Sequence, residues 1–241
     1  MIIYPAIDLQ NGKVVRLYKG DLTSATIYNE NPVEQAQKFV SEGFGWLHVV
    51  DLDGAANGIP TDASIVRDIL HHIDIPVQLG GGIRTHAHIE HWINEGISRV
   101  ILGTAAVKDP ELVVNACKEF PGQIAVGIDA RDGWVAVDGW VTDSNMQAID
   151  LAKKFEDAGV AAIIFTDIDR DGTGLGLNME RTIELAKSVS IPVIASGGVG
   201  SMNDLKAVKE ACKDGLNGLI VGKAYYEGQI DPTEALKLAA A

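Results

Sequence analysis

Short apolar runs alternate along the chain with segments whose apolar residues recur three and four positions apart. Strands buried on both faces are nearly continuous apolar runs, whereas a helix packed on a core has one apolar face. The runs predict eight strands, over residues 2–8, 46–51, 75–79, 99–102, 124–129, 161–166, 191–195 and 218–221. The amphipathic segments predict helices over residues 32–43, 62–71, 86–94, 110–119, 146–158, 178–188, 201–211 and 231–238.

The two halves of the chain repeat each other in sequence. Residues 7–14 are echoed by 128–135, 51–53 by 167–169, 81–83 by 197–199, and 100–103 by 219–222. Four echoes in one order, at an offset of about 120 residues, indicate an internal duplication. Eight strand–helix units with a two-fold repeat predict an α/β fold, a closed (β/α)8 TIM barrel built from two half-barrels, rather than an open doubly wound sheet.

Length, composition and charge limit the number of domains, the compartment and the kinds of partner that the protein can have. The 241 residues suit one barrel of about 250, and no linker-like segment divides them, so we expect a single domain over residues 1–241. No apolar run is long enough to span a membrane, and the first residues resemble a strand rather than a signal peptide. Cys117 and Cys212 lack metal-ligand spacing, which favours reduced thiols in a cytoplasmic protein. The net charge of −13 argues against a nucleic-acid partner but permits a small phosphorylated ligand.

Glycine-rich turns follow four of the predicted strands. In a (β/α)8 barrel the loops after the strands form the active site, and glycine lets several backbone N–H groups approach one anion. Each glycine could instead serve only a tight turn, but two matched pairs favour two phosphate sites on opposite sides of one barrel mouth. The residues concerned are Gly81, Gly82, Gly103 and Thr104 in the first half, and Ser196, Gly197, Gly198, Gly222 and Lys223 in the second.

One aspartate ends the first predicted strand and another ends the fifth. Strands one and five are diametrically opposite in an eight-stranded barrel, so Asp8 and Asp129 are expected to face each other across the mouth. Two such carboxyls can divide acid–base work, one accepting a proton while the other, with a raised pKa, donates one. The alternative is that each aspartate caps a strand–loop junction or pairs with a nearby cation.

These residues belong to motifs that resemble the ProFAR isomerases (phosphoribosylformimino-aminoimidazole-carboxamide ribotide isomerases) of histidine biosynthesis. The resemblance runs over essentially the whole chain and rests on residues 5–9, 12–17, 19–20, 48–53, 79–84, 139–140, 166–173 and 196–199. It implies an Amadori rearrangement of an aminoaldose to an aminoketose, on a substrate with a phosphate at each end. It further implies that Asp8 is the proton acceptor, that Asp129 is the proton donor, and that no metal or organic cofactor is required.

The resemblance also singles out side chains beyond the two aspartates. Thr166 breaks the internal repeat, since Val50 is its counterpart, and the resemblance favours a catalytic role over that of a strand-forming residue. Further candidate substrate contacts are Arg16, Gly20, Arg84, Trp140, Asp171, Gly172 and Lys223. The charged members could instead be ordinary solvated groups, and Trp140 could pack a loop rather than stack on the substrate.

His48 lies in the second predicted strand, three positions before Asp51. We interpret it as a histidine at the interface between barrel and helices, in preference to a catalytic group. The segments 20–31 and 131–144 are long enough to act as lids.

Three rival functions remain open. The related cyclase of the same pathway shares the barrel and the two aspartates. It typically has Cys-Leu-Asp near its start, where this chain has Ala6-Ile7-Asp8, and a lysine where this chain has Arg16-Leu17. Some relatives also isomerise phosphoribosylanthranilate and carry arginines flanking the Gly-Trp pair, which this chain lacks around Gly139-Trp140. A non-catalytic phosphosugar-binding barrel is the third, against which the intact aspartates speak. We expect a monomer.

Overall fold

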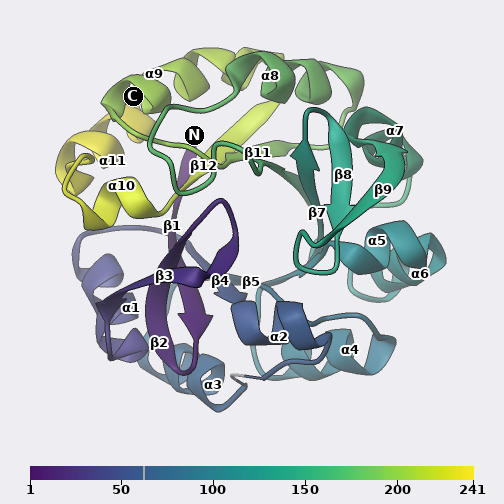
Figure 1. Cartoon of the computed structure of the whole chain (residues 1–241), viewed down its shortest axis with the longest axis horizontal. Coiled ribbons are helices and arrows are strands. Elements are labelled where there is room, and N and C mark those ends of the chain that lie inside the picture. The colour runs from purple at the N-terminus through teal and green to yellow at the C-terminus, as the bar shows by residue number, and fades with distance from the viewer. Residues whose placement is uncertain (62) are drawn as a thin grey trace.

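The computed structural model describes residues 1–61 and 63–241, in which parallel strands form a barrel surrounded by helices (Figure 1). Each barrel strand pairs in parallel with a neighbour on either side. The eighth barrel strand pairs with the first, which closes the ring. Around the ring the strands are β1 (Ile2–Gln10), β4 (Leu47–Asp51), β5 (Val77–Gly80), β6 (Arg99–Leu102), β7 (Ile124–Arg131), β10 (Ala162–Asp167), β11 (Val193–Ser196) and β12 (Leu216–Val221). The predicted (β/α)8 barrel is confirmed, with strand ends displaced by one or two residues.

Helices cover the outside of the barrel. The longer ones are α1 (Pro32–Ser41), α3 (Ala63–His72), α4 (His86–Asn94), α6 (Pro110–Glu119), α7 (Ala148–Lys154), α8 (Met179–Ser188), α9 (Met202–Ala211) and α11 (Pro232–Ala240). Short helices follow three barrel strands: α2 (Leu52–Asn57), α5 (Thr104–Lys108) and α10 (Lys223–Tyr226), and a 3-10 turn spans Cys212–Asp214. The helix predicted over 62–71 corresponds to α3, and Asp62 lies outside the described residues. Within the described residues, no helix has the length and apolarity needed to cross a bilayer.

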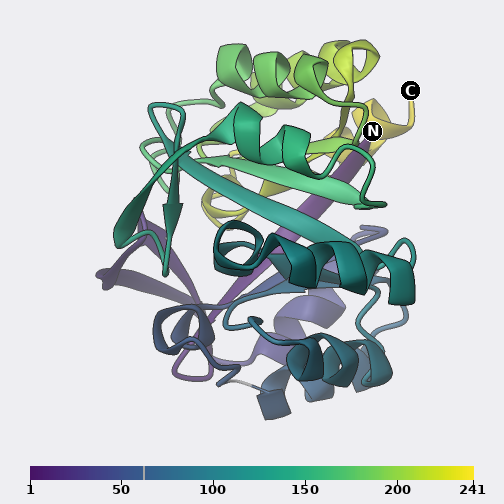
Figure 2. The same cartoon turned by 90° about the vertical axis from the view of Figure 1, so that its right-hand side faces the viewer.

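Two antiparallel hairpins extend corresponding barrel strands of the two halves. β2 (Lys13–Tyr18) and β3 (Asp21–Asn29) follow β1, while β8 (Trp134–Val137) and β9 (Thr142–Gln147) follow β7. Figure 2 shows both hairpins projecting from the same end of the barrel. The sequence analysis predicted no strands in these hairpins, because β3 and β9 have many exposed residues and no apolar alternation. The helix predicted over 146–158 is wrong at both ends, since β9 takes its first residues and α7 ends at Lys154.

Alternation along the strands separates two apolar layers. On β1, Ile3 and Ile7 pack toward the helices, while Tyr4 and Ala6 belong to the cluster that fills the barrel interior. On β7, Ile128 packs outward and Ala125 packs inward. Because successive side chains of a strand point to opposite faces, Asp8 and Asp129 share the inward face of their strands.

Candidate active site

One cavity opens at the mouth, the end of the barrel formed by the carboxyl ends of its strands, and has a volume of about 330 Å³. Every residue that the sequence analysis singled out as catalytic or substrate-binding lines it. They are Asp8, Arg16, Gly20, Gly81, Gly82, Arg84, Gly103, Thr104, Asp129, Trp140, Thr166, Asp171, Gly172, Ser196, Gly197, Gly198, Gly222 and Lys223. The mouth therefore gathers polar residues from both halves of the chain.

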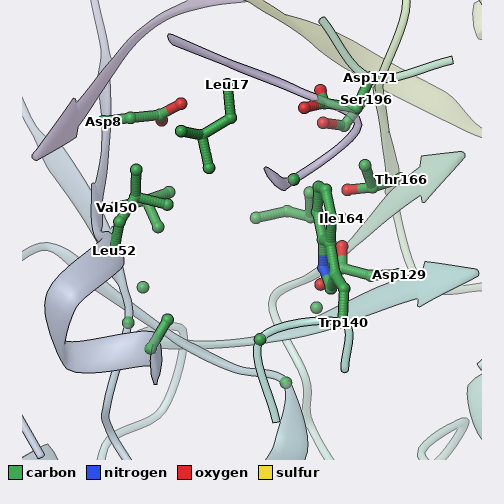
Figure 3. Close-up of a pocket in the computed structure, with 18 of the residues that line it drawn as sticks. Asp8, Leu17, Val50, Leu52, Asp129, Trp140, Ile164, Thr166, Asp171 and Ser196 are labelled. Carbon is green, nitrogen blue, oxygen red and sulfur yellow. The ribbon is translucent and has the colours of Figure 1, made fainter. Parts of the chain in front are cut away.

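Asp8 and Asp129 stand on opposite walls of this cavity (Figure 3). Their strands β1 and β7 are separated by three strands on either side of the ring. The facing arrangement predicted from the sequence is confirmed. A small molecule seated between the two walls can be approached by one carboxyl from each side.

The carboxylate of Asp8 is paired with a cation. Arg16 donates from Nη1 to Asp8 Oδ2 at 2.6 Å, and its Nη2 donates to the carbonyl of Ala6 at 2.6 Å. Burial raises the pKa of Asp8 above its usual value, and the positive charge and hydrogen bond of Arg16 oppose that rise. Arg16 therefore favours the ionised, proton-accepting form of Asp8.

Asp129 has hydrogen-bond donors rather than a cation around it. Thr166 on β10 is its register partner, and the side chains of Thr166 and Trp140 both hydrogen-bond to its carboxylate. Burial raises the pKa of Asp129, and these two hydrogen bonds lower it in part. Without a compensating cation, Asp129 is the better placed of the two facing aspartates to carry a proton.

Asp171, in the loop after β10, is a third buried carboxyl at the mouth. Its pKa is raised to about 7, chiefly by burial and also by the negative charges of Asp8 and Asp129, while the positive charge of Arg16 opposes the rise. The sequence analysis placed this residue in contact with substrate but did not predict a titrating group. That property depends on Asp8 and Asp129 converging from distant strands, which no local pattern encodes.

The first glycine cluster consists of Gly81, Gly82, Gly103 and Thr104. Gly81 and Gly82 have φ values of 104° and 69°, and a Cβ atom on Gly82 would lie 2.6 Å from the backbone of Ile59. Only glycine fits this close approach of two backbone segments. Arg84 flanks the cluster, donating to the carbonyl of Ala55 at 3.1 Å and lying 3.6 Å from Asp138.

The second glycine cluster consists of Ser196, Gly197, Gly198 and Gly222, with Lys223 beside it. Gly197 has a φ of 85°, and a Cβ there would lie 2.5 Å from the carbonyl oxygen of Asp167. The ammonium group of Lys223 donates to the carbonyl of Gly172 at 3.0 Å. The two clusters occupy equivalent places in the two halves, after β5 and β6 and after β11 and β12. They offer backbone N–H groups on two sides of one cavity, as two anionic groups would require.

The two hairpins meet across the mouth. A Cβ on Gly20, in the turn between β2 and β3, would overlap the indole ring of Trp140 between β8 and β9. Trp140 itself has a φ of 70°, a left-handed conformation that is costly for a bulky side chain. Trp140 thus contacts Asp129 and the opposite hairpin at once.

The structure corrects the interpretation of His48. Its neighbours Leu47 and Val49 pack in the layer between strands and helices, so His48 points into the barrel and lines the cavity. The sequence offered a signal for this, since His48 lies two positions before Val50, the counterpart of Thr166 in the internal repeat. Asp51, by contrast, caps α2, accepting from the N–H groups of Gly54 and Thr61 at 2.6 Å each.

Among the described residues, no group of three or more histidine, cysteine, aspartate or glutamate side chains is arranged to hold a metal ion.

Comparison with known proteins decides the family. A sequence model of the family described as "Histidine biosynthesis protein" matches residues 2–231. The chain belongs to this family. Among its relatives, a protein of Rhodospirillum centenum is 57% identical over 100% of this chain and 97% of its own length. Relatives from Brucella anthropi and Rhodopseudomonas palustris are each 58% identical over 99% of this chain, and over 98% and 97% of their own lengths.

All three relatives bear the name 1-(5-phosphoribosyl)-5-((5-phosphoribosylamino)methylideneamino)imidazole-4-carboxamide isomerase. That name describes an isomerase acting on a compound with two phosphoribosyl groups.

Proposed function

We propose that this member of the family is an aldose–ketose isomerase of histidine biosynthesis, an intramolecular oxidoreductase that converts ProFAR to its phosphoribulosyl isomer. The observation that carries the proposal is the pair Asp8 and Asp129 on opposite walls, with a glycine cluster to each side. The names of its full-length relatives specify the same reaction.

The reaction needs one proton donor and one proton acceptor on opposite sides of a sugar. We assign the donor role to Asp129, which protonates the ring oxygen of the aminoaldose as the ring opens to a protonated Schiff base. Asp8 then removes the proton from C2′, and the electron pair moves into the C1′–C2′ bond to give an enolamine. The enolamine tautomerises to the aminoketose. The iminium group of the substrate accepts the electron pair, so the proposed mechanism uses no cofactor.

The surroundings of the carboxyls support this division of labour. Arg16 favours an ionised Asp8, as a base requires, while burial favours a protonated Asp129, as an acid requires. Asp171, whose burial raises its pKa to about 7, is partly protonated near neutrality and can share the donor role. Thr166 orients Asp129 from the neighbouring strand.

The two phosphate groups are assigned to the two glycine clusters. Gly81, Gly82, Gly103, Thr104 and Arg84 would hold one, and Ser196, Gly197, Gly198, Gly222 and Lys223 the other, with Gly172 at the edge. Gly20 and Trp140 would close over the substrate between them, the indole ring stacking on the imidazole ring.

A spectrophotometric assay with the purified chain and the aminoaldose substrate tests the proposal. The same preparation is assayed with phosphoribosylanthranilate and for ammonia-dependent cyclase activity. We expect turnover of the aminoaldose alone. Tight binding of the bisphosphate without turnover would point instead to a non-catalytic phosphosugar-binding barrel.

We further infer that residues 1–241 unfold as one domain, that the chain acts as a monomer, and that it works in the cytoplasm. Supporting the first two points, β12 pairs with β1 to join the ends of the chain, and one copy supplies both glycine clusters. The unpaired thiols Cys117 and Cys212 suit a reducing compartment. A single denaturation transition, the sedimentation coefficient and cell fractionation check the three points in turn.

A further inference from the structure

A row of three polar side chains crosses the inside of the barrel below the mouth. His48 on β4, Gln78 on β5 and Arg99 on β6 are register partners on successive strands. Arg99 donates from Nη1 to Gln78 Oε1 at 3.1 Å, and Gln78 Nε2 lies 3.0 Å from His48 Nδ1. Gln78 is fully buried and His48 is 8% exposed. Burying such polar groups is costly unless they are hydrogen-bonded, and both ends of the Gln78 amide have a partner. The buried Nε of Arg99 has none among the described residues.

The chemistry of these groups dictates where the proton of His48 must be. A guanidinium can only donate, so the amide oxygen of Gln78 faces Arg99 and its NH2 group faces His48. An NH2 group donates, so His48 Nδ1 must accept and cannot carry a proton. The neutral ring therefore has its hydrogen on Nε2.

This Nε2–H faces the cavity without a partner of its own. The imidazole lines the mouth, and within residues 1–61 and 63–241 its one hydrogen bond is that of Nδ1 to Gln78, which leaves Nε2 free to donate to a molecule in the cavity. Burial lowers the pKa of His48 to about 3, with a contribution from the positive charge of Arg16. The ring is thus an uncharged hydrogen-bond donor at neutral pH, and it neither supplies nor takes up a proton there.

We propose that His48 is a catalytic hydrogen-bond donor, its Nε2–H directed at the C2′ oxygen of the substrate, and that Gln78 and Arg99 are positioning residues that hold it in this tautomer. The inference rests on the proposed isomerase function and adds a residue to it. Ala6 on β1 is the register partner of His48, which sets the imidazole one inward-facing position deeper than Asp8 on the adjacent strand. The carbon from which Asp8 removes a proton is the one that bears this oxygen.

The donor suits the reaction at that oxygen. The oxygen on C2′ is a hydroxyl in the aminoaldose and becomes the carbonyl of the aminoketose. In the last step the C2′ hydroxyl of the enolamine gives up its proton while C1′ takes one, and the oxygen becomes a carbonyl. A fixed N–H group stabilises the electron density that builds on this oxygen as its proton leaves, without itself being transferred. A neutral imidazole can polarise a carbonyl in this manner in another sugar-phosphate isomerase.

Two variants of His48 with side chains of similar length separate the effect of losing the hydrogen-bond donor from the effect of changing the shape of the side chain. In His48→Gln, the new amide can accept from Gln78 through its oxygen and still donate into the cavity. In His48→Met, no donor remains. We expect kcat to fall about 100-fold in His48→Met and to stay within about tenfold of wild type in His48→Gln, with small changes in KM. A His48→Met enzyme with near-normal kcat, or two folded variants equally impaired, would overturn the proposal.

The tautomer is tested by a measurement that does not depend on activity. Two-bond 1H–15N correlation spectra of the imidazole rings should show His48 of the wild type with its proton on Nε2, the His48→Gln spectrum giving the assignment. In Gln78→Glu, a carboxylate would accept from both Arg99 and His48, so the proton should move to Nδ1 and kcat should fall as in His48→Met. A proton on Nδ1 in the wild type would refute the proposal whatever the activities of the variants. Absence of ProFAR turnover by the wild type would instead contradict the proposed function, leaving the tautomer measurement valid.

Discussion

The guanidinium of Arg16 lies between Asp8 and Gly222, donating to the carboxylate at 2.6 Å while its Cζ occupies the place that a Cβ on Gly222 would need, at 2.5 Å. Arg16 therefore connects the ionisation of the proposed base to the second glycine cluster. Any group added at Gly222 must displace the arginine, because a guanidinium yields more readily than a barrel strand.

Gly222→Ala should change the pH profile of the enzyme. With Arg16 displaced, the pKa of Asp8 loses the contribution that lowers it, so the acidic limb of the kcat/KM profile should move to higher pH. Rates at pH 5 to 9 check this. The matched variant is Gly103→Ala at the equivalent place in the other half, where a Cβ would meet nothing closer than a carbonyl oxygen at 3.8 Å. Both variants add a methyl group to a glycine cluster, but only the first should shift the limb; equal shifts would disprove the coupling.

Asp8→Asn and Asp129→Asn should each abolish turnover while leaving ligand binding intact. An amide can neither accept the C2′ proton nor protonate the ring oxygen, so kcat should fall by about 1000-fold or more in each variant. The phosphate contacts come from the glycine clusters, so the dissociation constant of the ketose product, measured by calorimetry, should change little. Near-normal turnover in either variant would remove that aspartate from the mechanism.

Thr166→Val tests whether the hydroxyl on β10 acts on Asp129. The variant keeps the branched shape of a strand residue and removes one hydrogen bond that lowers the pKa of Asp129. We expect kcat to fall about tenfold and the basic limb of its pH profile to move upward, since the acid then holds its proton to higher pH. Thr166→Ser retains the hydroxyl and should preserve both quantities. If kcat and KM of Thr166→Val equal those of the wild type, only the strand-forming role remains.

The sequence predicts the position of a residue in the fold where the local pattern of apolar and polar residues is enough to determine it. Asp8 has the same inward parity as Tyr4 and Ala6, and the duplication puts Asp129 opposite it, so the facing carboxyls were predictable. β3 was not, because it is exposed and lacks the alternation that marks a buried strand. Neither was the Gln78 contact of His48, which depends on register between strands about thirty residues apart. The same holds for Asp171, whose titration depends on charges brought together only by the closed barrel.

Asp171 should make the stability of the protein depend on pH. A carboxyl ionises near pH 4 in the unfolded chain, whereas burial raises the pKa of Asp171 to about 7 in the folded state. Between these values the folded state binds more protons than the unfolded state, so this group lowers the free energy of unfolding as pH rises, with the loss complete above about pH 7. Removing the carboxyl should therefore stabilise the fold more at high pH than at low pH.

Urea denaturation of Asp171→Asn and wild type at pH 5 and pH 8 measures this effect. The gain in free energy of unfolding should be about 2 to 3 kcal/mol larger at pH 8 than at pH 5, because about two pH units separate pH 5 from the folded-state pKa. Asp169→Asn, which changes an exposed carboxylate in the same loop, should show no such difference. A gain for Asp171→Asn that is equal at both pH values would mean that Asp171 is already ionised at pH 5, and that it cannot share the donor role with Asp129.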